Sequence, residues 1–138
     1  MGEIHVDIDL ENIRDRNFFE GGQLRESDIR RAGVRAVADT GAVMLALPGD
    51  VVDQLGVPVV DSATFTYADG RRGELPIAGP LSIRIGNRST VARCVVVPPG
   101  GDALVGQLVM EELDLVPDPL NQTIGPRPES PDRPLLRL

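Results

Sequence analysis

The residues best placed to do chemistry are Asp39 and Thr40, which interrupt the apolar run VRAVADTGAVMLALP at residues 34–48. A carboxylate buried in such a run is costly in free energy unless it is hydrogen-bonded or shares its charge with another group. Two carboxyl groups held about 3 Å apart meet that condition, because they cannot both ionise and therefore share one proton. Such a pair can hydrolyse an amide bond without a metal, since one member activates water and the other protonates the leaving group.

Two other groups of residues are weaker candidates for chemistry. His5, Asp7 and Asp9 alternate with apolar residues, so they share one face of a predicted strand at residues 4–10. His5 is the only histidine, and we therefore expect a solvated strand face and no metal site. Cys94 lies in the apolar stretch ARCVVVP, where a small buried residue is expected in place of a nucleophile. We expect no cofactor.

Composition limits the classes of partner. The 138 residues, 41% of them hydrophobic, suffice for one domain, and the net charge of -7 argues against nucleic acid or anionic membranes. Four aromatic residues (Phe18, Phe19, Phe65 and Tyr67) give no stacking platform for bases. No apolar run approaches the roughly 20 residues of a membrane span. The acidic, alternating N-terminus is unlike a signal peptide, and there is one cysteine, so we expect a cytoplasmic protein.

The elements around Asp39 are predicted to be mostly strands. Residues 11–33 are charged and irregular, whereas residues 34–38 and 44–47 are strand-like and flank Asp39. PGDVVDQLGVP predicts a short helix that ends at Gly56, and QLVMEELDL predicts one or two further helical turns. Hairpins are expected at Asp69-Gly70 and at Gly86-Asn87. A strand, a small-residue turn and a helix thus occur twice, which suggests internal pseudo-symmetry.

The stretch around Asp39 resembles the catalytic loop of retropepsin-like aspartic proteases, small cellular and bacterial members above all. The resemblance covers roughly residues 34–124 and comprises an apolar strand leading into Asp39-Thr40-Gly41-Ala42, a hairpin at YADG, and ALVG at residues 103–106 before a helix. It implies a mainly β fold: a retropepsin-like closed β-barrel, the acid-protease fold, with one or two short helices and one pseudo-symmetric domain per chain.

The expected boundaries follow from the same resemblance. Residues 1–124 would form the domain, in which 1–33 are an N-terminal strand and a charged loop and 64–79 are a flap hairpin. Residues 125–138 hold four prolines and are expected to be an extended or disordered tail.

The resemblance also implies roles for individual residues. Asp39 would be catalytic together with Thr40 and Gly41, with Thr40 interlocking with the same loop of a partner and Gly41 allowing a tight turn whose N–H approaches the carboxylate. The hairpin would close over an extended polypeptide substrate and exclude water. The expected substrate-binding residues are Ala42, Val43, Tyr67, Ala68, Asp69, Gly70 and Leu104; plain core packing explains Ala42, Val43 and Leu104 equally well.

The motif count predicts the oligomeric state. Asp-Thr-Gly occurs once, and Asp102 in GGDALVG lacks the Thr-Gly that would make a second copy. A shared-proton pair therefore requires two chains, and we expect a symmetric homodimer with an Asp39–Asp39′ dyad. The viral members carry an ion pair near the dimer interface whose positions are here occupied by Val43 and Gln107. The geometry of this dimer should therefore differ from theirs.

Three hypotheses remain open from the sequence. The first is a homodimeric aspartic endopeptidase with an acidic to mildly acidic optimum, for which Phe18-Phe19 is a candidate site of self-cleavage. The second is a non-catalytic dimeric module that holds a peptide in the same cleft. The third is a monomeric β domain in which Asp39 caps a turn. The apolar end RPLLRL adds the hypothesis of a segment that pairs with a partner's edge or enters its cleft.

Overall fold

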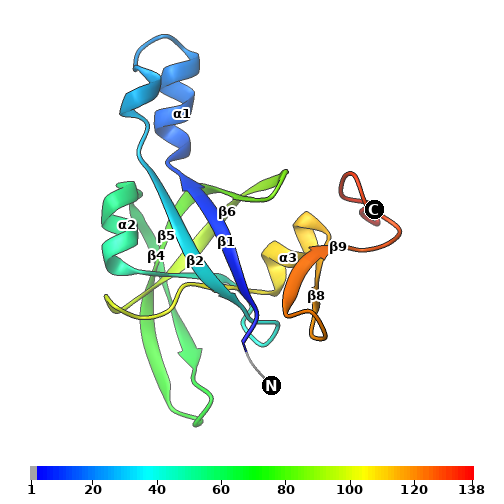
Figure 1. Ribbon diagram of the computed structural model, residues 1–138. Coiled ribbons are helices and arrows are strands. Elements are labelled where there is room, and N and C mark those ends of the chain that lie inside the picture. Colours follow the sequence, from blue (N-terminus) through cyan, green and yellow to red (C-terminus); the bar gives the residue numbers. More distant parts are fainter. Residues whose placement is uncertain (1–2) are drawn as a thin grey trace.

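The computed structural model describes residues 3–138 and is mainly β (Figure 1). Met1 and Gly2, part of the predicted N-terminal segment, lie outside the described residues. The elements in chain order are β1 (His5–Glu11), α1 (Ile13–Glu20), a 3-10 turn η1 (Glu26–Asp28), β2 (Arg31–Ala38), β3 (Leu45–Pro48), α2 (Gly49–Leu55), β4 (Val59–Thr66), β5 (Arg72–Ile85), β6 (Arg88–Val97), β7 (Leu104–Val105), α3 (Gln107–Leu113), β8 (Leu115–Asp118) and β9 (Thr123–Pro126).

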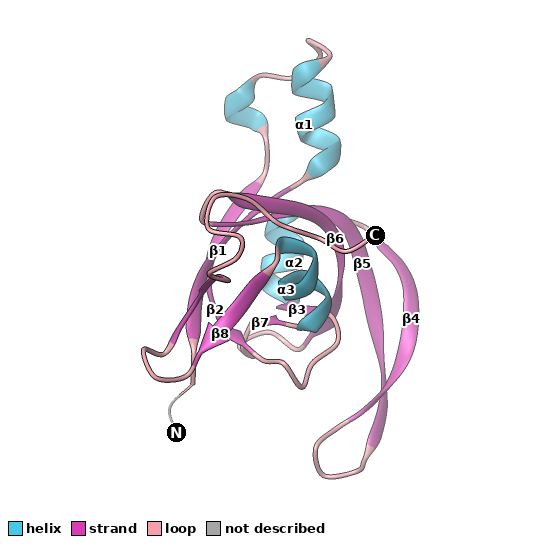
Figure 2. Ribbon diagram, turned by 90° about the vertical axis from the view of Figure 1, so that its right-hand side faces the viewer, coloured by secondary structure: helices cyan, strands magenta, loops and turns pink. Residues whose placement is uncertain are grey.

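Six strands form a closed ring of hydrogen bonds. The sheet order is β1-β2-β7-β3-β6-β5-β4, and β1 pairs with β5 as well as with β2. The strand β4 lies outside this ring and pairs with β5, so that the two form a hairpin that extends away from the other strands (Figure 2). The figures place α1 and the tip of this hairpin at opposite ends of the molecule.

The order of elements repeats along the chain. A long strand, a loop, a short strand and a helix occur as β2-β3-α2 and again as β6-β7-α3. Each short strand pairs in parallel with the long strand of the other unit: β3 with β6 and β7 with β2. The two short strands also pair with each other, at Ala46 and Leu104. This exchange brings the loop that begins with Asp39 beside β7.

The interior of the ring is filled by alternate residues of the strands, as the periodicity predicted. On β1, Val6, Ile8 and Leu10 are buried, while His5, Asp7 and Asp9 are exposed. The solvated strand face is therefore confirmed, and the described residues contain no group of three His, Cys, Asp or Glu that could hold a metal ion. Cys94 is buried, and burial raises the pKa of its thiol to about 11, so the thiolate is scarce near neutral pH.

The expectation of one or two helices is wrong, because α1 makes a third. Residues 11–33 were predicted to be irregular since they lack apolar periodicity, and α1 indeed buries only Asp15. Polar contacts hold the helix instead. The Asn12 side chain accepts the Asp15 N–H (3.0 Å) and donates to the Leu55 carbonyl at the end of α2 (2.8 Å). Both oxygens of Asp15 accept from Arg30, at 2.8 and 3.0 Å.

The C-terminal tail is extended and fixed to the body of the protein. The predicted boundary after residue 124 falls inside β9, which pairs with β8. Beyond β9, Arg127 donates to both carboxylate oxygens of Asp114, at 2.6 and 3.0 Å. The buried Arg88 donates to the carbonyls of Leu113 (2.9 Å), Asp114 (2.8 Å) and Ser130. Arg88 thus joins the carboxyl end of α3 to the tail.

Asp114 makes the stability of this junction pH-dependent. Its hydrogen bonds from Arg127 and from the Leu135 N–H hold the pKa of the carboxyl below its ordinary 3.8. The ionised carboxyl therefore stabilises the folded state above about pH 4, and this contribution is lost as the pH falls through the lower pKa of the folded protein. We expect Asp114→Asn to lower the melting temperature at pH 7 and to lower it less at pH 3. Asparagine tolerates the left-handed conformation of this residue (φ 55°).

Thermal melts at the two pH values check this expectation. Asp132→Asn is the matched control, because Asp132 is an exposed tail residue whose carboxylate makes no hydrogen bond among the described residues. A gap between Asp114→Asn and the unsubstituted protein that is as wide at pH 3 as at pH 7 would contradict the assignment.

Candidate functional site

Asp39 directly follows β2 and begins a loop, residues 39–44, that we call the Asp39 loop. Its N–H donates to the Val105 carbonyl of β7 (2.9 Å), and its own carbonyl accepts from the Ala42 N–H (3.1 Å). The Gly41 N–H donates to Oδ1 of the Asp39 carboxylate (2.9 Å). A tight turn thus fixes the backbone and aims one N–H at the carboxylate, as predicted for Gly41. Asp39 is half-buried in the single chain, and Thr40 is exposed.

The first turn of α3 holds the other half of the Asp39 loop. The N–H groups at the start of a helix lack partners within the helix. Here the Gln107 N–H donates to the Ala42 carbonyl (2.8 Å), and the Leu108 N–H donates to the Val43 carbonyl (3.1 Å). Gly106 permits this approach, since an added Cβ would lie 2.6 Å from the Met44 oxygen and 2.8 Å from the Ala42 oxygen. Both neighbours are backbone atoms and cannot swing aside.

A cleft of about 700 Å³ lies between the Asp39 loop and the β4–β5 hairpin. Most predicted site residues line it: Asp39, Gly41, Ala42, Val43, Tyr67, Ala68 and Leu104. Asp39 is its one carboxylate, and most of the other lining side chains are apolar. The cleft therefore presents an acid at one wall and hydrocarbon along the rest.

Three predicted site residues do not line this cleft. Thr40 is exposed and is not among the lining residues. Asp69 and Gly70 form the hairpin tip, where Gly70 has φ +86° and its N–H donates to the Tyr67 carbonyl (2.9 Å). The Asp69 carboxylate holds the turn by accepting from the Arg71 N–H (2.9 Å) and from Arg71 Nε (2.6 Å). The structure thus gives Asp69 a role in the turn.

The hairpin residues that line the cleft lie outside its tip. Tyr67 lies across Gly73 of the facing strand, where an added Cβ would be 2.9 Å from the Tyr67 hydroxyl oxygen. The bare backbone of Gly73 therefore makes room for the tyrosine ring. Residues that the sequence reasoning missed complete the cleft: Met44, Ala46, Thr64, Phe65, Thr66, Leu75, Val95 and Val97. The sequence offered a signal for two of these residues: Val95 and Val97 are two positions apart on β6, so they lie on the same face of the strand.

Neither the models of known protein families nor the curated protein sequences match this chain. Among the described residues, no helix is long and apolar enough to cross a membrane.

Proposed function

We propose that this protein is an aspartic endopeptidase that acts as a homodimer, with the retropepsin-like fold. The observation that carries the proposal is the position of Asp39: it lines a mostly apolar cleft, while the Gly41 N–H and the anchored Asp39 loop hold it in place. The closed ring of strands and the repeated order of elements support the fold.

The chemistry requires a second carboxyl group, and a second chain would supply it. The cleft of one chain contains one carboxylate, whereas water activation and leaving-group protonation need a base and an acid together. In the proposed dimer, Asp39 and Asp39′ share one proton across the twofold axis. The ionised member takes a proton from water as the water attacks the peptide carbonyl. The protonated member then gives its proton to the leaving nitrogen.

The remaining residues would position the substrate and the partner. Tyr67 and Ala68 of the hairpin would lie over an extended peptide, and Ala42, Val43 and Leu104 would contact apolar side chains. The exposure of Thr40 leaves its hydroxyl free to contact the partner's loop. The proposed place of action is the cytoplasm, where the free thiol of Cys94 stays reduced.

The Phe18–Phe19 bond is a poorer site of self-cleavage than its sequence suggests. Both residues belong to α1, and Arg14 and Arg16 lie over their rings at 5.7 and 5.6 Å. Peptides bind between a cleft and a hairpin in extended form. Cleavage at this bond would thus require α1 to unwind first.

Sedimentation and a concentration series test the dimer. We expect a species of twice the 14.8 kDa chain mass, and a cleavage rate that rises with the square of chain concentration while the dimer is mostly dissociated. A dimer that binds apolar peptides but cleaves none between acidic and neutral pH would favour the non-catalytic module. The cleft is formed within one chain, so it can bind a peptide even if the two Asp39 carboxyl groups do not act together. A monomer without peptide affinity would leave Asp39 as the cap of a turn.

A further inference from the structure

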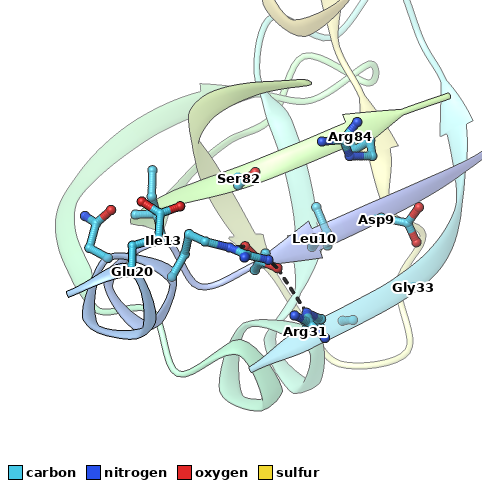
Figure 3. Close-up of a pocket in the computed structure, with 12 residues that line it drawn as sticks. Asp9, Leu10, Ile13, Glu20, Arg31, Gly33, Ser82 and Arg84 are labelled. Carbon is cyan, nitrogen blue, oxygen red and sulfur yellow. Dashed lines mark hydrogen bonds and ion pairs between the residues drawn. The ribbon is translucent and has the colours of Figure 1, made fainter. Parts of the chain in front are cut away.

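A second pocket, of about 670 Å³, lies at the opposite end of β2 from Asp39. Its floor is the stretch where β1 is paired on both sides, with β2 at residues 31–33 and with β5 at residues 82–84. One side of α1 forms its wall (Figure 3). None of its lining residues belongs to the cleft at Asp39.

The alternation of the strands makes the floor of this pocket polar. Leu10 points inward and is 1% exposed, so its neighbours Asp9 and Glu11 point outward. The register places Gly33 and Arg84 on either side of Asp9, and Arg31 and Ser82 on either side of Glu11. Because Gly33 has no side chain, the Asp9 carboxylate has room beside it, with Oδ1 3.7 Å from where a Cβ of residue 33 would stand.

Glu11 is already neutralised by two arginines. Arg16 of α1 donates to both of its oxygens, at 2.7 and 2.8 Å, and Arg31 donates through Nε at 3.0 Å. These bonds, with Arg16 first, hold the pKa of the Glu11 carboxyl below its usual value. Arg31 also lies beside a second carboxylate, with its Nη2 3.7 Å from Oε1 of Glu26. The charges around Glu11 are therefore balanced, and neither arginine is left without a partner.

The other charged groups of the pocket have no partner of opposite charge. Arg84 and Asp9 stand directly across from each other on β5 and β1. Figure 3 draws no interaction between them, and neither makes an ion pair within 4.0 Å or a side-chain hydrogen bond among residues 3–138. Glu20, at the other side of the pocket, is likewise unpaired within that range. Free groups of both signs thus face one space.

The mixture of charges selects among ligands. Asp9 and Glu20 would repel a phosphate dianion. The lining has no aromatic residue on which a nucleobase could stack. The described residues also contain no cluster that could hold a metal ion. We propose that this pocket binds a short peptide with free ends, its carboxylate on Arg84 and its ammonium on Asp9. Guanidinium–carboxylate pairs provide the bidentate geometry for the first contact. The proposal does not depend on protease activity at Asp39.

Calorimetric titration with the dipeptide alanyl-alanine, at low salt and neutral pH, tests the pocket. We expect saturable binding that weakens by about tenfold or more when the dipeptide is N-acetylated, and again when it is C-amidated, because each change removes one charge-assisted hydrogen-bonding group. No binding up to about 10 mM would overturn the proposal, since weaker association carries little specificity. Equally strong binding of acetate or inorganic phosphate would also overturn it by showing a simple anion site.

Paired variants assign the two contacts. Arg84→Gln should remove the preference for the free carboxylate, and Asp9→Asn should remove the preference for the free ammonium, each without loss of fold because both side chains are exposed. Arg35→Gln is the matched control, since Arg35 is exposed on β2 but does not line the pocket. Dipeptide affinity that survives both variants, or that falls equally with the control, would refute the assignment. Asp39→Asn should leave this binding unchanged, which separates it from the cleft.

Discussion

Asp39→Asn should abolish peptide hydrolysis while leaving the fold and the dimer intact. Asparagine has the size of aspartate, and its Oδ1 can still accept the Gly41 N–H that approaches Asp39 at 2.9 Å. It cannot take a proton from water or share one with its mate. In a symmetric dimer the substitution removes both carboxyl groups at once. We expect kcat to fall by about 10³-fold or more, the scale of losing general acid–base catalysis.

The control for this experiment is Asp102→Asn. Asp102 is exposed and lies in the loop before β7, which corresponds by the repeat to the Asp39 loop before β3. It lacks the following Thr-Gly, so its substitution should leave kcat unchanged. Unaltered sedimentation of both variants would show that any loss is chemical. Full activity of Asp39→Asn would contradict the proposed mechanism, and equal loss in both variants would indicate a dyad within one chain.

The strands and the Asp39 loop were predictable because local rules act strongly there. Alternation fixed the inward face of β1, and Gly56, with φ +66°, ends α2 where a helix stop was expected. The loop residues Asp39 and Gly41 form the turn that their types favour. In each case the deciding interaction lies within a few residues of the pattern, so the sequence pattern carries it directly.

The features that were missed depend on contacts between distant residues. The helix α1 is held by Asn12 on Leu55 and by Arg30 on Asp15, which no periodicity reveals. The tail is fixed through Arg88, 42 residues from Ser130 in the chain. The cleft likewise includes Val95 and Val97 of β6, a strand that pairs with the distant β3. Propensity and motif reasoning cannot supply such pairings, since tertiary contacts create them.

Gly106→Ala should lower both the stability and the proposed activity, although it replaces no charged residue. The new Cβ would lie 2.6 Å from the Met44 oxygen and 2.8 Å from the Ala42 oxygen, closer than such atoms approach. The Asp39 loop must therefore shift away from α3, which weakens the Gln107 and Leu108 N–H bonds that hold it. Overpacking of this kind costs about 1–3 kcal/mol of folding free energy. A displacement near 1 Å at a catalytic group costs about 10²-fold in rate.

Gly125→Ala is the matched control, because nothing lies within 4 Å of the position of its Cβ and Gly125 is not among the residues with positive φ. It should melt and cleave like the unsubstituted protein. For Gly106→Ala we expect a lower melting temperature and a fall in kcat/KM of about 10²-fold when assayed below its melting point. Intact activity with reduced stability would mean that α3 supports only the fold. A fall in both the melting temperature and kcat/KM would show that the backbone hydrogen bonds from α3 position the Asp39 carboxylate. Gly106 itself has no side chain that could take part in the reaction.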